Sequence, residues 1–219
     1  MIVNLSKWGD KLSIKDAKLN FIVEVATKLF LEKGINQVTI RDIATAVGVG
    51  EATIYRYFSK KQNIVVASAM RLEDEVFNKY FALNDGGNGF EKLSKFYTNF
   101  LLIFTEHIEF YKFINDFDSY FINEVGDLSN YEESLRPFYK SYLDAYNLGL
   151  IDKSILKLEN IELFYFTTTH SLLGLCKKLS YDKEILAQDS KVKKSDEIKQ
   201  LISIILYSLK AYESNISSN

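Results

Sequence analysis

Several residue types are scarce in this chain of 219 residues, and each scarcity excludes a class of protein. A single cysteine, Cys176, excludes an internal disulfide, and the two histidines, His107 and His170, provide no cluster that resembles a zinc site. No run of about 18 uncharged apolar residues occurs, and the first ten residues lack the apolar core of a signal peptide. We therefore expect a cytoplasmic protein that has no membrane contact, no metal and no other cofactor.

The residue constellations of catalysis are also missing from the sequence. We find no nucleophile with a matching base, no metal-binding cluster and no glycine-rich loop that would cradle a phosphate. The sequence therefore predicts a protein that is not an enzyme.

The charge is distributed unevenly along the chain. The formal net charge is −2, but residues 1–61 contain ten Lys and Arg against six Asp and Glu, which gives +4 there and leaves −6 for the rest. A local basic excess is what binding to phosphate requires, and dimerisation would double it. With 47% hydrophobic residues, the chain can bury the core of one or two domains.

The stretch 39–61 has the residue spacing of a helix-turn-helix. Thr39 and Asp42 form a T-x-x-D capping box that predicts the start of a helix. Apolar residues then recur on one helical face, and they include Ala44, which is small enough for a second helix to cross closely. Gly48 follows where the chain must turn sharply, because glycine accepts a positive φ without steric cost. A second helix is expected directly after it.

The second helix has an inner and an outer face. Val49 from the turn, Ile54 and Phe58 are spaced to pack against the first helix. The outward positions form a short, mixed and polar surface that suits a major groove; they are Gly50, Glu51, Ala52, Thr53, Tyr55, Arg56 and Tyr57. The alternative is a short helical hairpin inside some other all-α protein.

Residues 30–64 resemble the DNA-binding domain of the tetracycline-repressor (TetR) family of bacterial transcription regulators. The resemblance rests on Thr39, Arg41, Ile43, Ala44, Gly48, Val49, Thr53, Tyr55, Tyr57, Phe58 and Lys61. It covers the first quarter to third of the chain, whereas the remainder matches only in length and helical character. It implies an all-α fold with a three-helix DNA-binding domain over residues 1–62, including an N-terminal arm, and a helical ligand-binding and dimerisation domain over 63–219.

The resemblance also implies residue roles at the DNA. The family positions that approach DNA match Thr39, Arg41, Gly50, Glu51, Ala52, Thr53, Tyr55, Arg56, Tyr57 and Lys61. Arg41 and Arg56 are the best readers of base edges, because a guanidinium binds guanine with two hydrogen bonds. The hydroxyl residues and Lys61 suit phosphate contacts that set the register. Gly50 and Glu51 depart from a strongly basic reader, which leaves the operator sequence open.

Between the two predicted domains we expect a long connecting helix. A capping box of Ser59 and Gln62 opens it, and it runs to about Leu83. The glycine-rich stretch 86–89 then ends the helix and is the best candidate for a linker.

The second domain is rich in aromatic residues, with ten of them in the 26 positions from Phe96 to Phe121. These rings either fill a helical core or line a cavity for a lipophilic or planar ligand. The predicted ligand-binding residues are Tyr97, Phe100, Phe104, His107, Phe113, Phe117, Tyr142, Tyr146, Phe166 and His170. The neighbouring acidic residues are either a solvated face or partners for a cationic ligand.

The last two predicted helices suggest a dimer interface. Small and apolar residues recur at helical spacing between Leu158 and Leu179, and the helix from Asp196 to Tyr212 carries a wide apolar stripe. The predicted interface comprises Leu163, Thr167, Ser171, Gly174, Ile198, Leu201, Ile202, Ile205 and Leu209. Burial within one chain is the alternative, and the family resemblance favours the interface.

These expectations combine into one functional hypothesis. A homodimer binds a palindromic operator in double-stranded DNA and represses transcription until a small lipophilic or aromatic effector, not identified by the sequence, binds the second domain. One alternative keeps the DNA binding and replaces the small molecule with a protein partner or with no effector. Another is an architectural protein whose helix-turn-helix binds protein.

Overall fold

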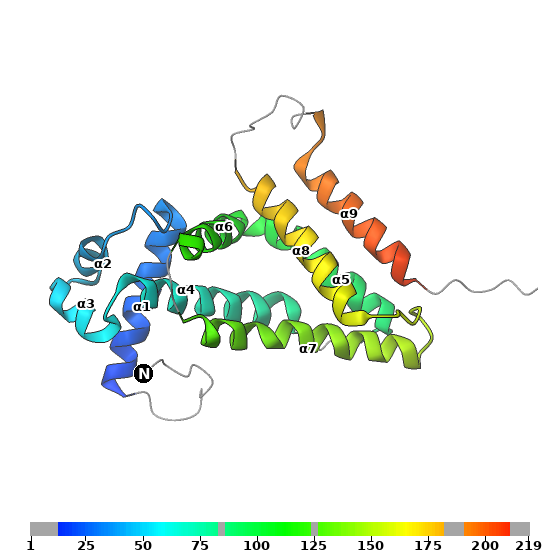
Figure 1. Cartoon of the computed structure of the whole chain (residues 1–219), viewed down its shortest axis with the longest axis horizontal. Helices are drawn as coiled ribbons and strands as arrows, with labels where there is room; N and C mark the ends of the chain where they lie inside the picture. The colour runs from blue at the N-terminus through cyan, green and yellow to red at the C-terminus, as the bar shows by residue number, and fades with distance from the viewer. Residues whose placement is uncertain (1–12, 83–85, 124–126, 182–190, 211–219) are drawn as a thin grey trace, which may run out of the picture. The chain divides into compact units, whose positions relative to one another are not determined.

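The computed structural model describes residues 13–82, 86–123, 127–181 and 191–210. Within these ranges the chain is helical, which confirms the predicted all-α class, and an isolated bridge joins Ile155 to Lys210. No helix there combines the length and the apolar character needed to cross a membrane. The helical elements (Figure 1) are α1 Ile14–Lys33, α2 Ile40–Val47, α3 Glu51–Phe58, α4 Lys61–Val76, the π-helix η1 Phe77–Phe81, α5 Gly89–Glu106, α6 Ile108–Asn123, α7 Ser129–Ile151, α8 Ile161–Leu179 and α9 Lys194–Leu209.

The helices pack into two compact units. Unit 1 contains the described residues of Met1–Glu75 and Lys112–Leu135, and unit 2 contains those of Val76–Tyr111 and Arg136–Asn219. The chain therefore leaves unit 1 near the end of α4, re-enters it within α6 and leaves it again within α7. The functional boundary predicted at residue 62 stays a prediction.

Unit 1 begins with α1, whose start and end follow local rules. Ser13 caps the helix through a reciprocal capping box with Asp16, and Gly34 ends it with a φ of 83°. Ile22, Ala26 and Phe30 are buried along one face of α1. Helices α2 and α3 complete a three-helix unit with α1, as Figure 1 shows.

The connection from α3 to α4 differs from the prediction. Ser59 is the C-cap of α3 with a φ of 55°, and α4 begins two residues later at Lys61. After Val76 the helix continues without a break as the wider π-helix η1 to Phe81, close to the predicted end. Leu83, the predicted end of the helix, lies outside the described residues.

The glycine-rich stretch 86–89 also has a different role from the linker that we predicted. Asn88 caps α5 by a capping box with Glu91, and Gly89 is the first residue of that helix. Gly89 is buried against Gly149 of α7, so close that a Cβ built on Gly89 would lie 2.1 Å from the Gly149 nitrogen. Gly89 is therefore part of the core of unit 2, whereas Gly86, Gly87 and Asn88 are exposed.

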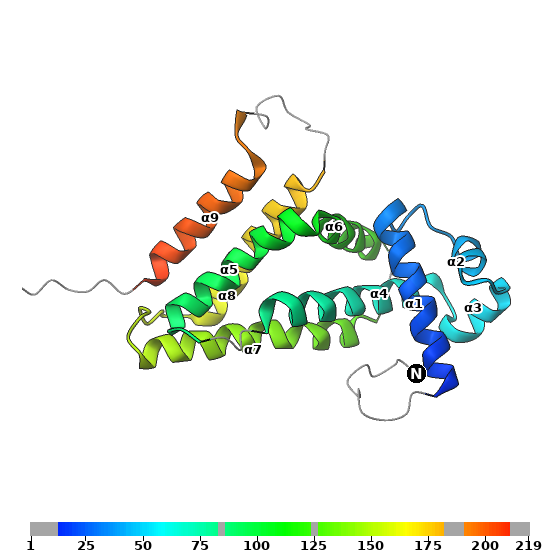
Figure 2. The same cartoon turned by 180° about the vertical axis from the view of Figure 1, so that it is seen from behind.

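Unit 2 is built around α5, and Figures 1 and 2 both show α9 beside α5 and α8. The rings of Phe81, Phe96 and Tyr142 pack edge to face, with centroids 5.0 Å apart for Phe81 and Phe96 and 5.2 Å apart for Phe96 and Tyr142. Cys176 is buried in the same unit. Helix α9 ends at Leu209, and Tyr212, its predicted end, lies outside the described residues.

Candidate functional site

The helix-turn-helix has the local geometry that the sequence predicts. The Asp42 backbone N–H donates to Thr39 Oγ1 at 3.1 Å, and the Thr39 N–H donates to Asp42 Oδ2 at 2.8 Å, which completes the capping box. The Thr39 hydroxyl also donates to Asp42 Oδ2, and this hydrogen bond, with that from the Thr39 N–H, holds the pKa of Asp42 below its ordinary value. Gly48 adopts the left-handed conformation, and the Val49 N–H then donates to the Ala44 carbonyl at 3.0 Å. The turn between α2 and α3 is fixed by these contacts.

Helix α3 places its polar face outward. Ile54 and Phe58 are buried against the rest of the unit, whereas Val49 keeps 37% of its surface exposed and packs less than we predicted. Of the predicted DNA-contacting residues, Thr39, Arg41, Gly50, Glu51, Ala52, Tyr55 and Arg56 are exposed, and Thr53, Tyr57 and Lys61 are half-buried. The structure therefore brings these positions together on and around one short helix.

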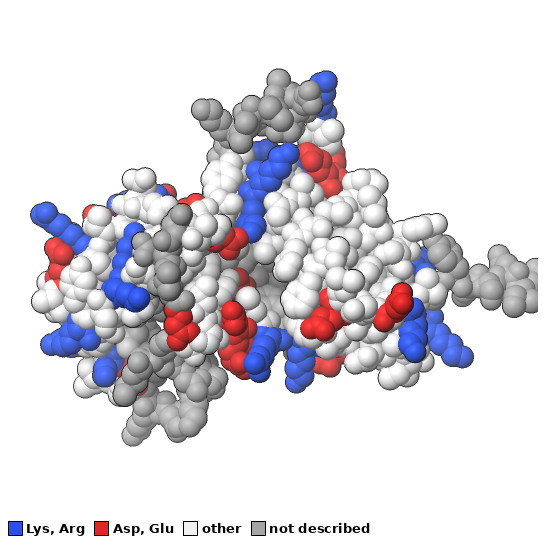
Figure 3. Space-filling model, viewed as in Figure 1, with Lys and Arg blue, Asp and Glu red and all other residues white. Residues whose placement is uncertain are grey.

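The charges on this surface are few and mixed in sign. Glu51 lies in the first turn of α3, and the Arg56 guanidinium lies over the Tyr57 ring, 5.5 Å from its centroid. On the face drawn in Figure 3, Lys and Arg side chains around α1–α3 are separated from one another, with Asp and Glu side chains between some of them. Lys15 and Lys18 of α1 are also exposed. The hydroxyl of Ser13, at the start of the same helix, donates a hydrogen bond to Asp16.

Lys61 differs from the other predicted DNA contacts, because its ammonium group is bound inside unit 1. It donates to the Ile35 carbonyl at 2.6 Å and lies 5.5 Å from the centroid of the Tyr120 ring. Burial lowers the pKa of Lys61, and the carboxylate of Asp42 opposes that shift. Neither contact was foreseen, since both join residues far apart in the sequence.

The predicted ligand-binding residues fall into several environments. Tyr97 and Tyr142 are buried, and the Tyr97 hydroxyl lies 3.1 Å from that of Tyr142 and 2.8 Å from Thr168 Oγ1. Burial raises the pKa of Tyr97 to about 12, so its hydroxyl stays neutral. Tyr146 is also buried and accepts a hydrogen bond from the Leu158 N–H.

The other predicted ligand-binding residues do not gather around this hydroxyl network. Phe104 is buried and Phe100 is half-buried within unit 2, whereas Phe166 and His170 are exposed on α8. Phe113 and Phe117 are buried in unit 1, where the Phe117 ring packs on that of Tyr131. The predicted set is therefore divided between the two units.

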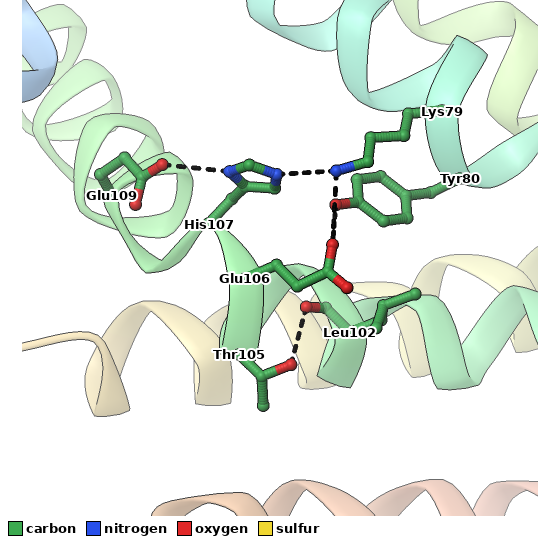
Figure 4. A network of polar contacts seen from close by, with 7 residues as sticks. All are labelled: Lys79, Tyr80, Leu102, Thr105, Glu106, His107 and Glu109. Carbon is green, nitrogen blue, oxygen red and sulfur yellow. Dashed lines mark hydrogen bonds and ion pairs between the residues drawn. The ribbon is translucent and has the colours of Figure 1, made fainter.

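His107 belongs to a polar cluster at the turn between α5 and α6 (Figure 4). Its Nε2 lies 2.9 Å from the Lys79 ammonium, and its Nδ1 lies 3.3 Å from Glu109. Because the ammonium can only donate, Nε2 is the acceptor in the first contact, which leaves Nδ1 to face the Glu109 carboxylate. Lys79 also pairs with Glu106, which accepts a hydrogen bond from Tyr80 at 2.8 Å. Lys79 and Tyr80 were not among the predicted residues, because nothing in the local sequence links η1 to this turn.

Glu73 is a buried ionisable residue that was not among the predicted site residues. It is buried on α4, its carboxylate lies 3.3 Å from the Tyr131 hydroxyl, and burial raises its pKa to about 7. The negative charge of Asp118 acts in the same direction. The signal was present in the sequence, because Glu73 follows Ala69 by one helical turn on an otherwise apolar face of α4.

The predicted dimer residues divide between surface and core. On α8, Leu163, Thr167, Ser171 and Gly174 are exposed. On α9, Ile198, Ile202, Ile205 and Leu209 are buried within the chain and Leu201 is half-buried, so the alternative of burial within one chain describes these residues better. Ile204 and Tyr207 form the exposed apolar part of α9 instead.

Comparison with known proteins agrees with the geometry of the helix-turn-helix. Residues 22–68 match the family described as bacterial regulatory proteins, tetR family. The HTH-type transcriptional repressor KstR2 of Rhodococcus jostii is 32% identical over 72 residues, which are 33% of this chain and 35% of that repressor. The alignment therefore spans only about a third of that relative.

Two longer matches extend the similarity in fold. IcaR of Staphylococcus epidermidis, the negative transcriptional regulator of the biofilm operon icaADBC, is 23% identical over 197 residues, which cover 84% of this chain and 97% of IcaR. The structure of the ketosteroid transcriptional regulator KstR2 of Mycobacterium tuberculosis superposes with a TM-score of 0.59 at 18% identity, covering 93% of this chain and 98% of that one. Residues 22–68 therefore match the tetR family of bacterial regulatory proteins, and the fold of the chain is shared with solved transcriptional regulators.

Proposed function

We propose that this protein is a repressor that acts in the cytoplasm, binds a palindromic operator as a homodimer and leaves it when a small lipophilic or aromatic molecule binds. The observation that carries the proposal is the helix-turn-helix of α2 and α3, which presents a short polar helix face with Arg56 on its exposed side. Two copies of α3 would enter successive major grooves about 34–36 Å apart. The printed names of two relatives, a repressor and a negative regulator, support the direction of control.

Replacing Arg56 tests DNA recognition directly. An operator is first selected from random duplexes by the wild-type protein, and its affinity for the variants is then measured. We expect Arg56→Ala to lose about 1–3 kcal/mol for each half-site, because the guanidinium no longer binds a base edge. The variant should also no longer prefer one base pair at the operator position that Arg56 contacts.

Arg56→Lys is the matched control for this prediction. It keeps the positive charge but cannot form the planar pair of hydrogen bonds, so nonspecific binding should persist while discrimination at one base pair weakens. If Arg56→Ala selects the same sequence with the same affinity as the wild type, Arg56 is not a base reader.

The homodimer is supported by the exposed face of α8. Leu163 is 63% exposed there, and Thr167, Ser171 and Gly174 follow on the same face, where their small side chains permit close approach of a second helix. Ile204 and Tyr207 add apolar surface on α9. Such a face can pack against the same face of a second copy across a two-fold axis.

A lysine on this face should break the dimer. We expect Leu163→Lys to raise the dimer dissociation constant at least about 30-fold, because a charge would be buried opposite its own copy. Ile151→Lys is the matched control, since Ile151 is 78% exposed at the end of α7 and outside the proposed interface. Sedimentation equilibrium distinguishes the two, and equal dissociation constants would count against an interface on α8.

The aromatic residues either contact a small-molecule effector or form only the core of unit 2. The aromatic content of unit 2 supports an apolar effector, and Phe100, Phe104 and Tyr146 are predicted contacts that lie in this unit. The satisfied hydroxyls of Tyr97 and Tyr142 favour the alternative, in which these rings are core and control comes from a protein partner or from no effector. Apolar aromatic compounds that lower operator affinity while the protein stays dimeric would decide for the small molecule.

A further inference from the structure

Glu51 is an acidic residue at the start of the helix that the proposed function places in the major groove. It is the first residue of α3, its side chain is exposed, and it lies one helical turn before the exposed Tyr55. Among the residues that the structure describes, none forms a hydrogen bond or an ion pair with the Glu51 side chain. Glu51 is therefore open to a partner from outside the chain.

The acidic residues in the first turns of the two preceding helices have a structural task that Glu51 lacks. Asp16 and Asp42 each complete a capping box with the N-cap residue of their helix. The N-cap of α3 is Gly50, and no side chain caps this helix. Only the positive end of the α3 dipole favours a carboxylate here, and that effect is weak at an exposed, salt-screened position. The fold alone gives little reason for an acidic residue at position 51.

A carboxylate on a helix in the major groove lies between two phosphate backbones. The phosphates repel it, and an ionised carboxylate has no hydrogen to donate to their oxygens. Arg56 on the same helix can bind a phosphate or a base, whereas Glu51 can bind DNA only through a donor on a base edge. Glu51 therefore opposes binding wherever no such donor faces it.

The four bases offer different groups to a carboxylate in the major groove. Cytosine presents the N4 amino group, which is a donor. Adenine presents the N6 amino group beside the N7 acceptor, guanine presents the acceptors N7 and O6, and thymine presents the O4 acceptor and a methyl group. Cytosine is therefore the base that attracts the carboxylate without an acceptor of its own in the groove, and guanine and thymine repel it.

We infer that Glu51 is a specificity-determining residue, which accepts a hydrogen bond from the N4 amino group of one cytosine in each operator half-site and rejects guanine and thymine at that position. The inference rests on the proposed function, because it names one base contact of the same recognition helix. Its consequence is that Glu51 lowers affinity for most sequences and gains discrimination through that repulsion.

Changing the base and the side chain together tests this contact. An operator is selected from random duplexes by the wild-type protein, and each of its cytosines is then replaced by thymine symmetrically in both half-sites. At one position we expect thymine to weaken wild-type binding by about tenfold or more for each half-site. Glu51→Ala should bind the selected operator less tightly than the wild type and this thymine version more tightly, because it loses both the hydrogen bond and the repulsion.

Glu51→Gln provides the second arm of the experiment. Glutamine keeps the length of the side chain but adds donors, and it binds adenine through two hydrogen bonds. Selection with this variant should therefore move the preference at that position from cytosine to adenine and leave the other positions unchanged. If Glu51→Ala and Glu51→Gln both select the wild-type sequence, the carboxylate reads no base and the inference is wrong.

Glu32→Gln is the matched control for the loss of a negative charge from the same unit. Glu32 is exposed on α1, so its replacement should change affinity for the cytosine and thymine operators by the same factor. Thermal unfolding establishes that each variant is folded at the temperature of the binding assay. If the wild-type protein enriches no sequence, the proposed function fails together with the inference. A wild-type operator that tolerates thymine at every cytosine overturns the inference alone.

Discussion

Gly89→Ala is expected to destabilise the protein by about 4 kcal/mol or more, a loss large enough to unfold many domains of this size. The added Cβ would lie 2.1 Å from the Gly149 nitrogen, 2.2 Å from its Cα and 2.6 Å from the Ala145 carbonyl oxygen. These are backbone atoms of α7, so no side-chain rotation can relieve the overlap and one helix has to move. Urea unfolding at a fixed protein concentration measures the loss.

Gly86→Ala is the matched control for this substitution. Gly86 lies three residues earlier, is exposed and has no neighbouring atom within 4 Å of a built Cβ. Its replacement should change the free energy of unfolding by less than about 0.5 kcal/mol. If Gly89→Ala unfolds at the same urea concentration as Gly86→Ala, the close approach of α5 and α7 is wrong.

Glu73→Gln is expected to stabilise the protein at neutral and alkaline pH by on the order of 3 kcal/mol. Burial raises the pKa of Glu73 from 4.5 to about 7 in the folded protein. Below about pH 4.5 the group is protonated in both the folded and the unfolded chain and has no effect on stability. As the pH rises from 4.5 to 7, only the unfolded chain releases the proton, so the folded state loses stability, and above 7 the loss is constant.

Unfolding at pH 4.5 and pH 8 tests this expectation. The wild-type protein and Glu73→Gln should differ little at pH 4.5 and strongly at pH 8, because glutamine keeps the acceptor oxygen for the Tyr131 hydroxyl without a buried charge. Glu75→Gln is the control, since Glu75 lies two residues later and pairs on the surface with Arg71. If Glu73→Gln raises the free energy of unfolding equally at both pH values, Glu73 does not titrate between them.

The helix-turn-helix could be predicted because its determinants are local. The capping box of Thr39 and Asp42, the left-handed Gly48 and the apolar positions of α2 and α3 all lie within 20 residues of one another. Each rule therefore needs only the neighbouring sequence, and all of them agree.

The contacts of Lys61 and Glu73 could not be predicted for the opposite reason. Lys61 meets Ile35 and Tyr120, and Glu73 meets Tyr131, at separations of 26 to 59 residues that only the packing of unit 1 establishes. Sequence spacing indicated that Lys61 lies near the DNA-binding surface, but not where its ammonium is held.

The stripe on α9 shows a different limit of the sequence. Helical periodicity identified Ile198, Ile202, Ile205 and Leu209 as one apolar face, and all four are buried. Periodicity predicts that a helix face is buried. It does not tell whether the residues that bury it belong to the same chain or to a second copy. The aromatic residues of α5 and α6 are ambiguous in the same way between core and ligand contact.

The π-helix η1 makes this part of the chain sensitive to its length. The Ala82 N–H reaches back to the Phe77 carbonyl, one residue further than in an α-helix. Deleting one residue between them would restore α-helical hydrogen bonding but rotate the preceding and following side chains by about 100° relative to each other. Phe81 would then leave the ring of Phe96, and Tyr80 would leave Glu106. Homologous chains that keep these contacts are therefore expected to vary freely at the exposed Asn78 while showing no insertions or deletions across this segment.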